Sequence, residues 1–251
     1  MRLLSIDWDF FFPTKEEDDT EWQLYDWGHS ENWSSGLQDV AWTHRAAGFL
    51  GNGFPLPGTS GEEKDFWKRF RFSKNARLFI AESHMHCASE EVRIGVTEVV
   101  NYDAHHDCGY VDHPLVRIIE ERTANCEDWM LVYSAYNGAD ARVIYPSWRT
   151  QGIMAADKLL ISGISRAIDD GRYCIDQVFD RVFIARSGAW TPPWIDKNFA
   201  EFVESCPIEY STVIGELEMI RYFDTQEAEK IVTEWKEFNS YREKMEKQCP
   251  R

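Results

Sequence analysis

The chain has 251 residues, of which 43% are hydrophobic and 14% aromatic, which is enough apolar surface for a full-sized domain and too much for a disordered protein. Its 27 basic residues stand against 43 acidic ones, giving a net charge of −16. Such a charge repels phosphate backbones and anionic lipids, so we expect neither nucleic acid nor a membrane as a partner. The six cysteines are spaced singly and the first residues contain no signal-peptide core, so a cytoplasmic location is expected.

Short apolar strands alternate with helical patterns along the chain. A strand is expected from Leu3 to Phe12, followed by a loop or lid over residues 14–35. The other predicted strands are short apolar runs at 77–81, 98–102, 142–145, 158–162 and 181–185. The predicted helices span 37–50, 60–72, 112–122, 127–136 and 225–247. This alternation predicts a single α/β domain over residues 1–251 with a largely parallel sheet.

The histidines are unevenly distributed, because all seven lie in the first 113 residues and five fall within one stretch of thirty. Two polar motifs lie in that stretch, Glu82-Ser-His84-Met-His86 and Asp103-Ala-His105-His106-Asp107, and each follows a predicted strand. A third motif, Asp7-Trp-Asp9, lies within the first strand. Because an open α/β sheet places its chemistry at the carboxyl ends of its strands, we expect these motifs to meet.

The residue types in these motifs predict a metal site. Unpaired Asp and His side chains at the end of a core strand cost several kcal/mol unless an ion or hydrogen bonds compensate. Two histidines and four aspartates form a hard, oxygen-rich donor set that suits Mn²⁺ best, with Zn²⁺ or Fe²⁺ as alternatives. The predicted ligands of one or two ions are Asp7, Asp9, His84, Asp103, His105 and Asp107.

The same motifs resemble those of the arginase/agmatinase and histone-deacetylase superfamily. Asp103-Ala-His105-His-Asp107 is similar to its D-A-H-x-D signature, Ser5-Ile-Asp7-Trp-Asp9-Phe-Phe-Phe-Pro13 to its S-F-D-x-D-x-x-D-P strand, and His84 to the histidine of its G-G-D-H-S segment. One branch of this superfamily resembles the chain more closely, because it carries E-D-H, D-S-H-P-D, E-N-W and I-D-x-D-F-F motifs. Glu127-Asp-Trp129 corresponds to its E-N-W motif. The resemblance covers scattered motifs over residues 1–190.

This resemblance implies a three-layer α/β/α fold with about seven or eight mostly parallel strands. The family places the D-x-D strand late, whereas here it begins the chain, so the resemblance also implies a circular permutation or a rewired sheet. Carried over by position, Asp103 and Asp7 would bridge two ions. His84 and Asp107 would complete one ion's ligands, and His105 and Asp9 the other's.

The implied activity is that of a metallohydrolase acting on non-peptide C–N bonds. A hydroxide activated by the metal would cleave a linear guanidine, amidine or amide bond of a small guanidino or acylated substrate. His86 is then the candidate proton shuttle, and Glu82 the residue that holds a ligand histidine in its tautomer. Substrate contacts are expected from His29 in the lid, Glu127, Asp128 and Trp190. A homo-oligomer is left open.

Two other functions remain alternatives at this point. An N-terminal strand ending in D-x-D is also the nucleophile motif of haloacid-dehalogenase-like Mg²⁺ phosphohydrolases, although Phe11 and Phe12 stand where that family has Ser or Thr. A non-catalytic binding module with a structural metal is the second alternative. Metal content and turnover separate the three functions.

Overall fold

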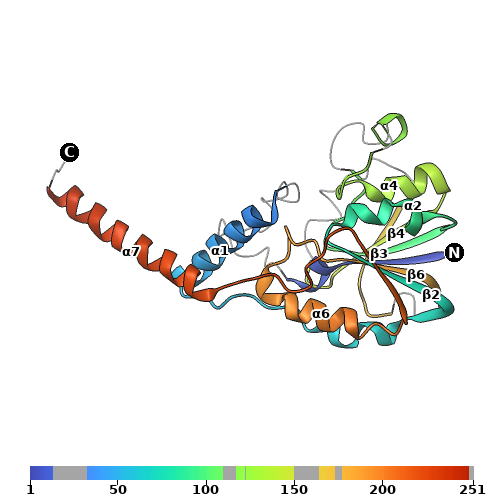
Figure 1. The fold of residues 1–251 in the computed structure, drawn as a ribbon, viewed down its shortest axis with the longest axis horizontal. Helices are drawn as coiled ribbons and strands as arrows, with labels where there is room; N and C mark the ends of the chain where they lie inside the picture. Colours follow the sequence, from blue (N-terminus) through green and yellow to red (C-terminus); the bar gives the residue numbers. More distant parts are fainter. Residues whose placement is uncertain (14–32, 110–116, 122, 150–163, 173–176, 249–251) are drawn as a thin grey trace.

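The computed structural model describes residues 1–13, 33–109, 117–121, 123–149, 164–172 and 177–248 (Figure 1). Seven strands form one sheet in the order β5-β4-β3-β1-β6-β2-β7, and all neighbouring strands are parallel. The strands are β1 Arg2–Asp7, β2 Arg71–Ala81, β3 Glu98–Tyr102, β4 Asp140–Tyr145, β5 Ile164–Ile168, β6 Val178–Ala185 and β7 Tyr210–Ile214. The prediction of a mostly parallel α/β sheet is therefore confirmed.

Helices cover both faces of the sheet, which makes three layers. In Figure 1, α2 and α4 lie on one face and α6 lies on the other. The α-helices are α1 Ser35–Gly51, α2 Glu90–Arg93, α4 Trp129–Val132, α6 Asp196–Glu204 and α7 Thr225–Gln248. Short 3-10 helices are η1 Trp8–Phe11, η4 Glu62–Arg69, η5 His84–Ala88 and η8 Pro193–Ile195, and π-helical turns are η6 Arg117–Glu121 and η7 Tyr133–Asn137. Among the described helices, none combines the length and the apolar character that crossing a membrane requires.

The alternation of side chains along β1 divides the interior into two clusters. Leu4 and Ile6 pack into the cluster on the α6 side, whereas Leu3 packs into the cluster on the α2 and α4 side. Because successive side chains of a strand point to opposite faces, Ser5 and Asp7 share the face of Leu3. Ser5 and Asp7 therefore face the α2 and α4 layer.

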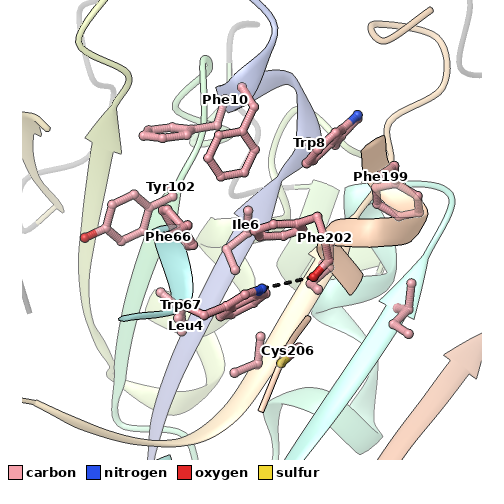
Figure 2. Close-up of a cluster of buried hydrophobic side chains, with 14 of the residues drawn as sticks. Leu4, Ile6, Trp8, Phe10, Phe66, Trp67, Tyr102, Phe199, Phe202 and Cys206 are labelled. Atoms are coloured by element: carbon pink, nitrogen blue, oxygen red, sulfur yellow. Dashed lines mark hydrogen bonds between the residues drawn. The ribbon is translucent and has the colours of Figure 1, made fainter. Parts of the chain in front are cut away.

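The cluster on the α6 side is strongly aromatic (Figure 2). Phe66 is fully buried at its centre, with ring centroids 5.1 Å from both Phe11 and Tyr102 and 5.8 Å from Phe202. Trp67 stacks on Phe202 at 4.7 Å and donates a hydrogen bond from Nε1 to its carbonyl oxygen at 3.0 Å. These contacts fix η4 and α6 against the end of β1, where the first acidic motif lies.

Several predicted boundaries differ from the structure. The first strand ends at Asp7 rather than Phe12, because the Asp7 carboxylate accepts the backbone N–H of Asp9 at 3.3 Å and caps η1. The predicted helix over 60–72 is a 3-10 helix that ends at Arg69, and β2 begins soon after it. Strands β5 and β7 and helix α6 were not predicted. The predicted strand 158–162 and nearly all of the 14–35 loop lie outside the described residues.

Replacing Phe66 by alanine should lower the free energy of unfolding by about 3–5 kcal/mol, because it leaves a cavity within a close-packed aromatic cluster. Urea unfolding followed by circular dichroism measures this change. Phe54→Ala is the matched control, since Phe54 is 55% exposed, and it should cost less than about 0.5 kcal/mol. Equal effects of the two substitutions would contradict the assignment of Phe66 to the core.

Candidate metal centre

Neighbouring parallel strands bring the acidic motifs together at one edge of the sheet. Strand β1 ends at Asp7, and β3 pairs with it so that Leu3 lies beside Val99 and Ser5 beside Asn101. This register places Asp103, the residue after β3, next to Asp7. His84 enters from the turn that follows β2.

The first group of potential ligands consists of Asp7, His84, Asp103 and Asp107, all of which are buried. His84 Nδ1 lies 3.1 Å from Asp7 Oδ2, 3.2 Å from Asp103 Oδ2 and 3.2 Å from Asp107 Oδ2. A single ring nitrogen has at most one proton, so it cannot donate well to three carboxylates at once. Ligands about 2.1 Å from an octahedral ion lie about 3.0 Å apart, and the observed spacing is close to that.

Each of the three carboxylate oxygens around His84 also accepts a hydrogen bond from outside the group. Ser187 Oγ donates to Asp7 Oδ2 at 2.7 Å, and Asn101 Nδ2 donates to Asp103 Oδ2 at 2.9 Å. Trp129 Nε1 donates to Asp107 Oδ2 at 2.6 Å. Such donors orient a ligand carboxylate and leave its remaining lone pair directed at the centre of the group.

The second ring nitrogen of His84 is held by Ser5. The distance from Ser5 Oγ to His84 Nε2 is 2.6 Å, and both side chains are buried. If Nε2 carries the proton and donates it to Ser5, Nδ1 keeps its lone pair for a metal ion. Phe183 stacks on the ring with centroids 5.8 Å apart and Trp129 packs on it at 4.5 Å, so the ring orientation is fixed.

The second group consists of Asp9, Asp103 and His105 and shares Asp103 with the first. Asp9 Oδ2 is buried and pairs with His105 Nδ1, which lies 2.8 Å away. The other oxygen, Asp9 Oδ1, accepts the backbone N–H of Ala104 at 3.2 Å. The His105 side chain is 17% exposed, so this group lies nearer to solvent than the first.

Two residues at the site have a left-handed backbone conformation that is unusual outside glycine. Asp107, with φ 48°, belongs to the first group, and Ser187, with φ 51°, donates a hydrogen bond to Asp7 of that group. Such conformations cost about 1–3 kcal/mol each and persist only where the surroundings impose them.

A buried arginine helps to hold the loop that carries Ser187. Arg221 Nη1 donates to the carbonyl oxygen of Gly188 at 2.8 Å, and Nη2 donates to that of Thr191 at 2.8 Å. Asp196 neutralises this arginine at 2.7 Å.

The electrostatics of the groups without ions are unfavourable. Burial, with repulsion between neighbouring carboxylates, raises the pKa of Asp7 and of Asp103 to about 7. Burial also raises the pKa of Asp107. Burial lowers the pKa of the two ligand histidines, but the carboxylates outweigh it, so that the pKa of His84 is well above 6.5 and that of His105 is about 9. Without cations, bound protons therefore compensate part of the negative charge of the carboxylates.

The residues present fit divalent cations. The four buried aspartates carry four negative charges when ionised, which two divalent cations would neutralise. The oxygen-rich donor set and the spacing of the carboxylate oxygens around His84 Nδ1 both suit a hard ion. Among the described residues, Asp103 is the member that the two groups share, whereas Asp7 belongs to the first group; that Asp7 also bridges two ions stays a prediction.

The two residues expected to assist catalysis lie away from the ligand groups. Glu82 does not contact a ligand histidine; its carboxylate pairs with Arg186 and accepts the backbone N–H of Gly188 at 3.1 Å. His86 lies beside Gly215, the residue after the edge strand β7, and burial lowers its pKa. Ser5 takes the orienting role that was predicted for Glu82. Ser5 lies two residues before Asp7 in β1, so the two side chains point to the same face of the sheet. This spacing was the sequence signal that could have identified Ser5.

Two of the residues expected to contact substrate, Glu127 and Asp128, form hydrogen bonds with the backbone. Asp128 is fully buried and accepts the backbone N–H of Asn125 at 2.7 Å, while the carbonyl oxygen of Glu127 accepts from Gly109 at 2.8 Å. Their neighbour Trp129 reaches the metal centre instead.

Trp190 packs on the second group, with its ring centroid 4.8 Å from that of His105. His106 is turned into the protein, where its Nδ1 accepts the backbone N–H of Cys108 at 3.0 Å. Burial lowers the pKa of His106 to about 3, so it stays neutral. His29 lies outside the described residues.

Neither the protein-family models nor the curated proteins or solved structures compared with this chain match it significantly.

Added Mn²⁺ should stabilise the protein more at pH 8.5 than at pH 5.5. Without ions, Asp7 and Asp103 have folded-state pKa values of about 7 against 3.8, so their contribution to stability is lost as the pH rises from about 4 through 7. His105, with a pKa of about 9, loses its contribution as the pH rises through 9. Ions replace the lost protons, so thermal unfolding of chelator-treated protein with and without Mn²⁺ measures the difference. An equal or larger shift at pH 5.5 would contradict this account.

Replacing Ser5 by alanine should weaken metal binding in the first group by about 10- to 100-fold, because His84 loses the partner that orients it. Isothermal titration calorimetry with Mn²⁺ measures the affinity. Ser205→Ala is the control, since Ser205 hydrogen-bonds Phe202 in α6 at 2.8 Å, and it should leave binding unchanged. Wild-type affinity in Ser5→Ala would show that Ser5 does not orient the ligand.

Proposed function

We propose that the chain is a metal-dependent hydrolase that cleaves a linear, non-peptide C–N bond in a guanidine, amidine or amide. The observation that carries the proposal is the pair of buried Asp/His groups that share Asp103 at the carboxyl edge of a parallel sheet. Mn²⁺ is the proposed ion because the donor set contains four carboxylates and two imidazoles and no thiolate.

The ligands have distinct tasks in this proposal. When bound, divalent ions supply Lewis acidity, which polarises the electrophile and makes hydroxide available near neutral pH. Asp103, which belongs to both groups, would serve both ions, and Asp7, His84 and Asp107 would hold the buried one. Asp9 and His105 would hold the ion nearer to solvent. The donors Ser187, Asn101 and Trp129 keep the carboxylates aligned.

The substrate would approach from the side of His105. The side chain of His84 is 1% exposed and that of His105 is 17% exposed, which leaves the second group as the accessible one. Trp190 packs against His105 and is itself partly exposed, so its ring forms a wall along which a planar or cationic group can lie. This wall orients the reacting carbon and helps to exclude water.

The phosphohydrolase alternative is less well supported by the environment of Asp7. A nucleophilic aspartate needs one oxygen open to the phosphorus atom. Asp7 is 4% exposed, Oδ2 accepts from Ser187 and faces His84, and Oδ1 accepts the N–H of Asp9. A non-catalytic metal module differs from the proposal only in turnover.

Metal content of purified variants tests how the ions are held. Plasma mass spectrometry should find about two Mn²⁺ ions per wild-type chain after reconstitution. Asp103→Asn should lose both ions, whereas His84→Ala and His105→Ala should each lose one, because only Asp103 serves both groups. Asp65→Asn, which changes an exposed acid, should keep both. Full metal content in Asp103→Asn would refute the assignment.

Turnover separates the hydrolase from a binding module. Reconstituted protein should release urea or ammonia from guanidino compounds, or acetate from acetylated amines, and Asp103→Asn should reduce this release to background. The same preparations are assayed with a phosphate monoester. Phosphatase activity with Mg²⁺ would favour the first alternative, and metal binding without any turnover would favour the second.

A further inference from the structure

Helix α7 carries an apolar stripe whose first part is packed against α1 and whose later residues are exposed among the described residues. Ala228 is fully buried and Val232 is 8% exposed, and both pack against Ala46 and Ala47 of α1. Trp235 is 41% exposed, and its ring lies 6.4 Å from that of His44, also in α1.

Beyond Trp235 the helix projects away from the sheet and from α1 (Figure 1). There Phe238 is 65% exposed, Tyr241 is 62% exposed and Met245 is 43% exposed. A free helical end of this length is marginal in water unless something packs on it. The exposed stripe is therefore a candidate contact surface.

The spacing of the stripe matches a two-helix seam. Trp235, Phe238, Arg242 and Met245 follow one another at intervals of three, four and three residues, which is the a/d repeat of a coiled coil. Tyr241 flanks the seam. Ion pairs between residues four apart, such as Arg242 with Glu246 at 3.8 Å, stabilise the helix alongside it.

We propose that the exposed half of α7 is a dimerisation surface whose occupant is α7 of a second copy, packed antiparallel. In this orientation, residues whose numbers add to 480 face each other. Trp235 then meets Met245 of the second copy, a favourable sulfur–aromatic contact. Phe238 meets Arg242 of the second copy, a cation–π contact. A parallel pair in register would instead place the two Arg242 guanidinium groups in one layer.

Net charge also favours the antiparallel arrangement. Helix α7 contains six acidic and five basic residues, so nearly all of the net charge of −16 lies outside it. Antiparallel helices hold the two acidic bodies at opposite ends of the pair, whereas parallel helices would bring them side by side and make them repel. The exposed end is only about 20 Å long, so we expect a dissociation constant in the micromolar range.

Sedimentation equilibrium of the full chain between 1 and 200 µM tests the dimer. Phe238→Glu should weaken association at least about tenfold, because it places a charge in the seam. Ser240→Glu is the matched control: it adds the same charge at an exposed position on the opposite side of the helix and should leave association unchanged. Because both side chains are exposed, circular dichroism and thermal unfolding should show both variants to be folded.

Cross-linking tests the orientation. When Trp235→Cys and Met245→Cys chains are mixed in a Cys249→Ser background and oxidised, mass spectrometry should find a disulfide between positions 235 and 245 of different chains. Disulfides that join 235 only to 235 and 245 only to 245 would overturn the antiparallel arrangement. A wild-type chain that is monomeric at 200 µM, or equal association of the Phe238→Glu and Ser240→Glu variants, would overturn the dimer. Monomers that sediment with anionic vesicles through Phe238 would assign the stripe to a membrane surface instead.

Discussion

The structure depends on one constraint: four aspartates lie close together in a buried space, with two histidines among them. Burial, with repulsion between the carboxylates, raises the pKa of Asp7 and of Asp103 to about 7, so without cations these two carboxyl groups are partly protonated at neutral pH. Cations remove this conflict. The aromatic core, the strained backbone at Ser187 and the buried Arg221 all serve to keep these side chains in place.

The pleat of the parallel strands supplies both the ligands and the groups that orient them. Ser5 and Asn101 lie side by side on β1 and β3, one pleat before Asp7 and Asp103, and on the same face. Ser5 holds His84, and Asn101 holds Asp103. When a candidate ligand lies at the end of a strand, the residue two positions earlier points to the same face and can hydrogen-bond a ligand side chain.

The parallel sheet and the candidate ligand groups could be predicted from sequence because both follow from local patterns. Short apolar runs identified β3, and part of β2, β4 and β6, and the polar residues that follow the strands are the six candidate ligands that the structure brings together. The edge strand β7 was missed, since its burial pattern contains no fully buried residue. The roles of Glu82, His86 and Trp129 depend on which residue far along the chain each one meets: Arg186, Gly215 and Asp107 respectively. These contacts join residues that are far apart in the sequence, so the spacing of motifs along the chain does not predict them.

The most direct test of the central claim is anomalous diffraction at the manganese absorption edge from crystals of the reconstituted protein. The account predicts two anomalous peaks, one among Asp7, His84, Asp103 and Asp107 and the other among Asp9, Asp103 and His105. A difference map without a peak among these residues, or with manganese bound only elsewhere, would contradict it.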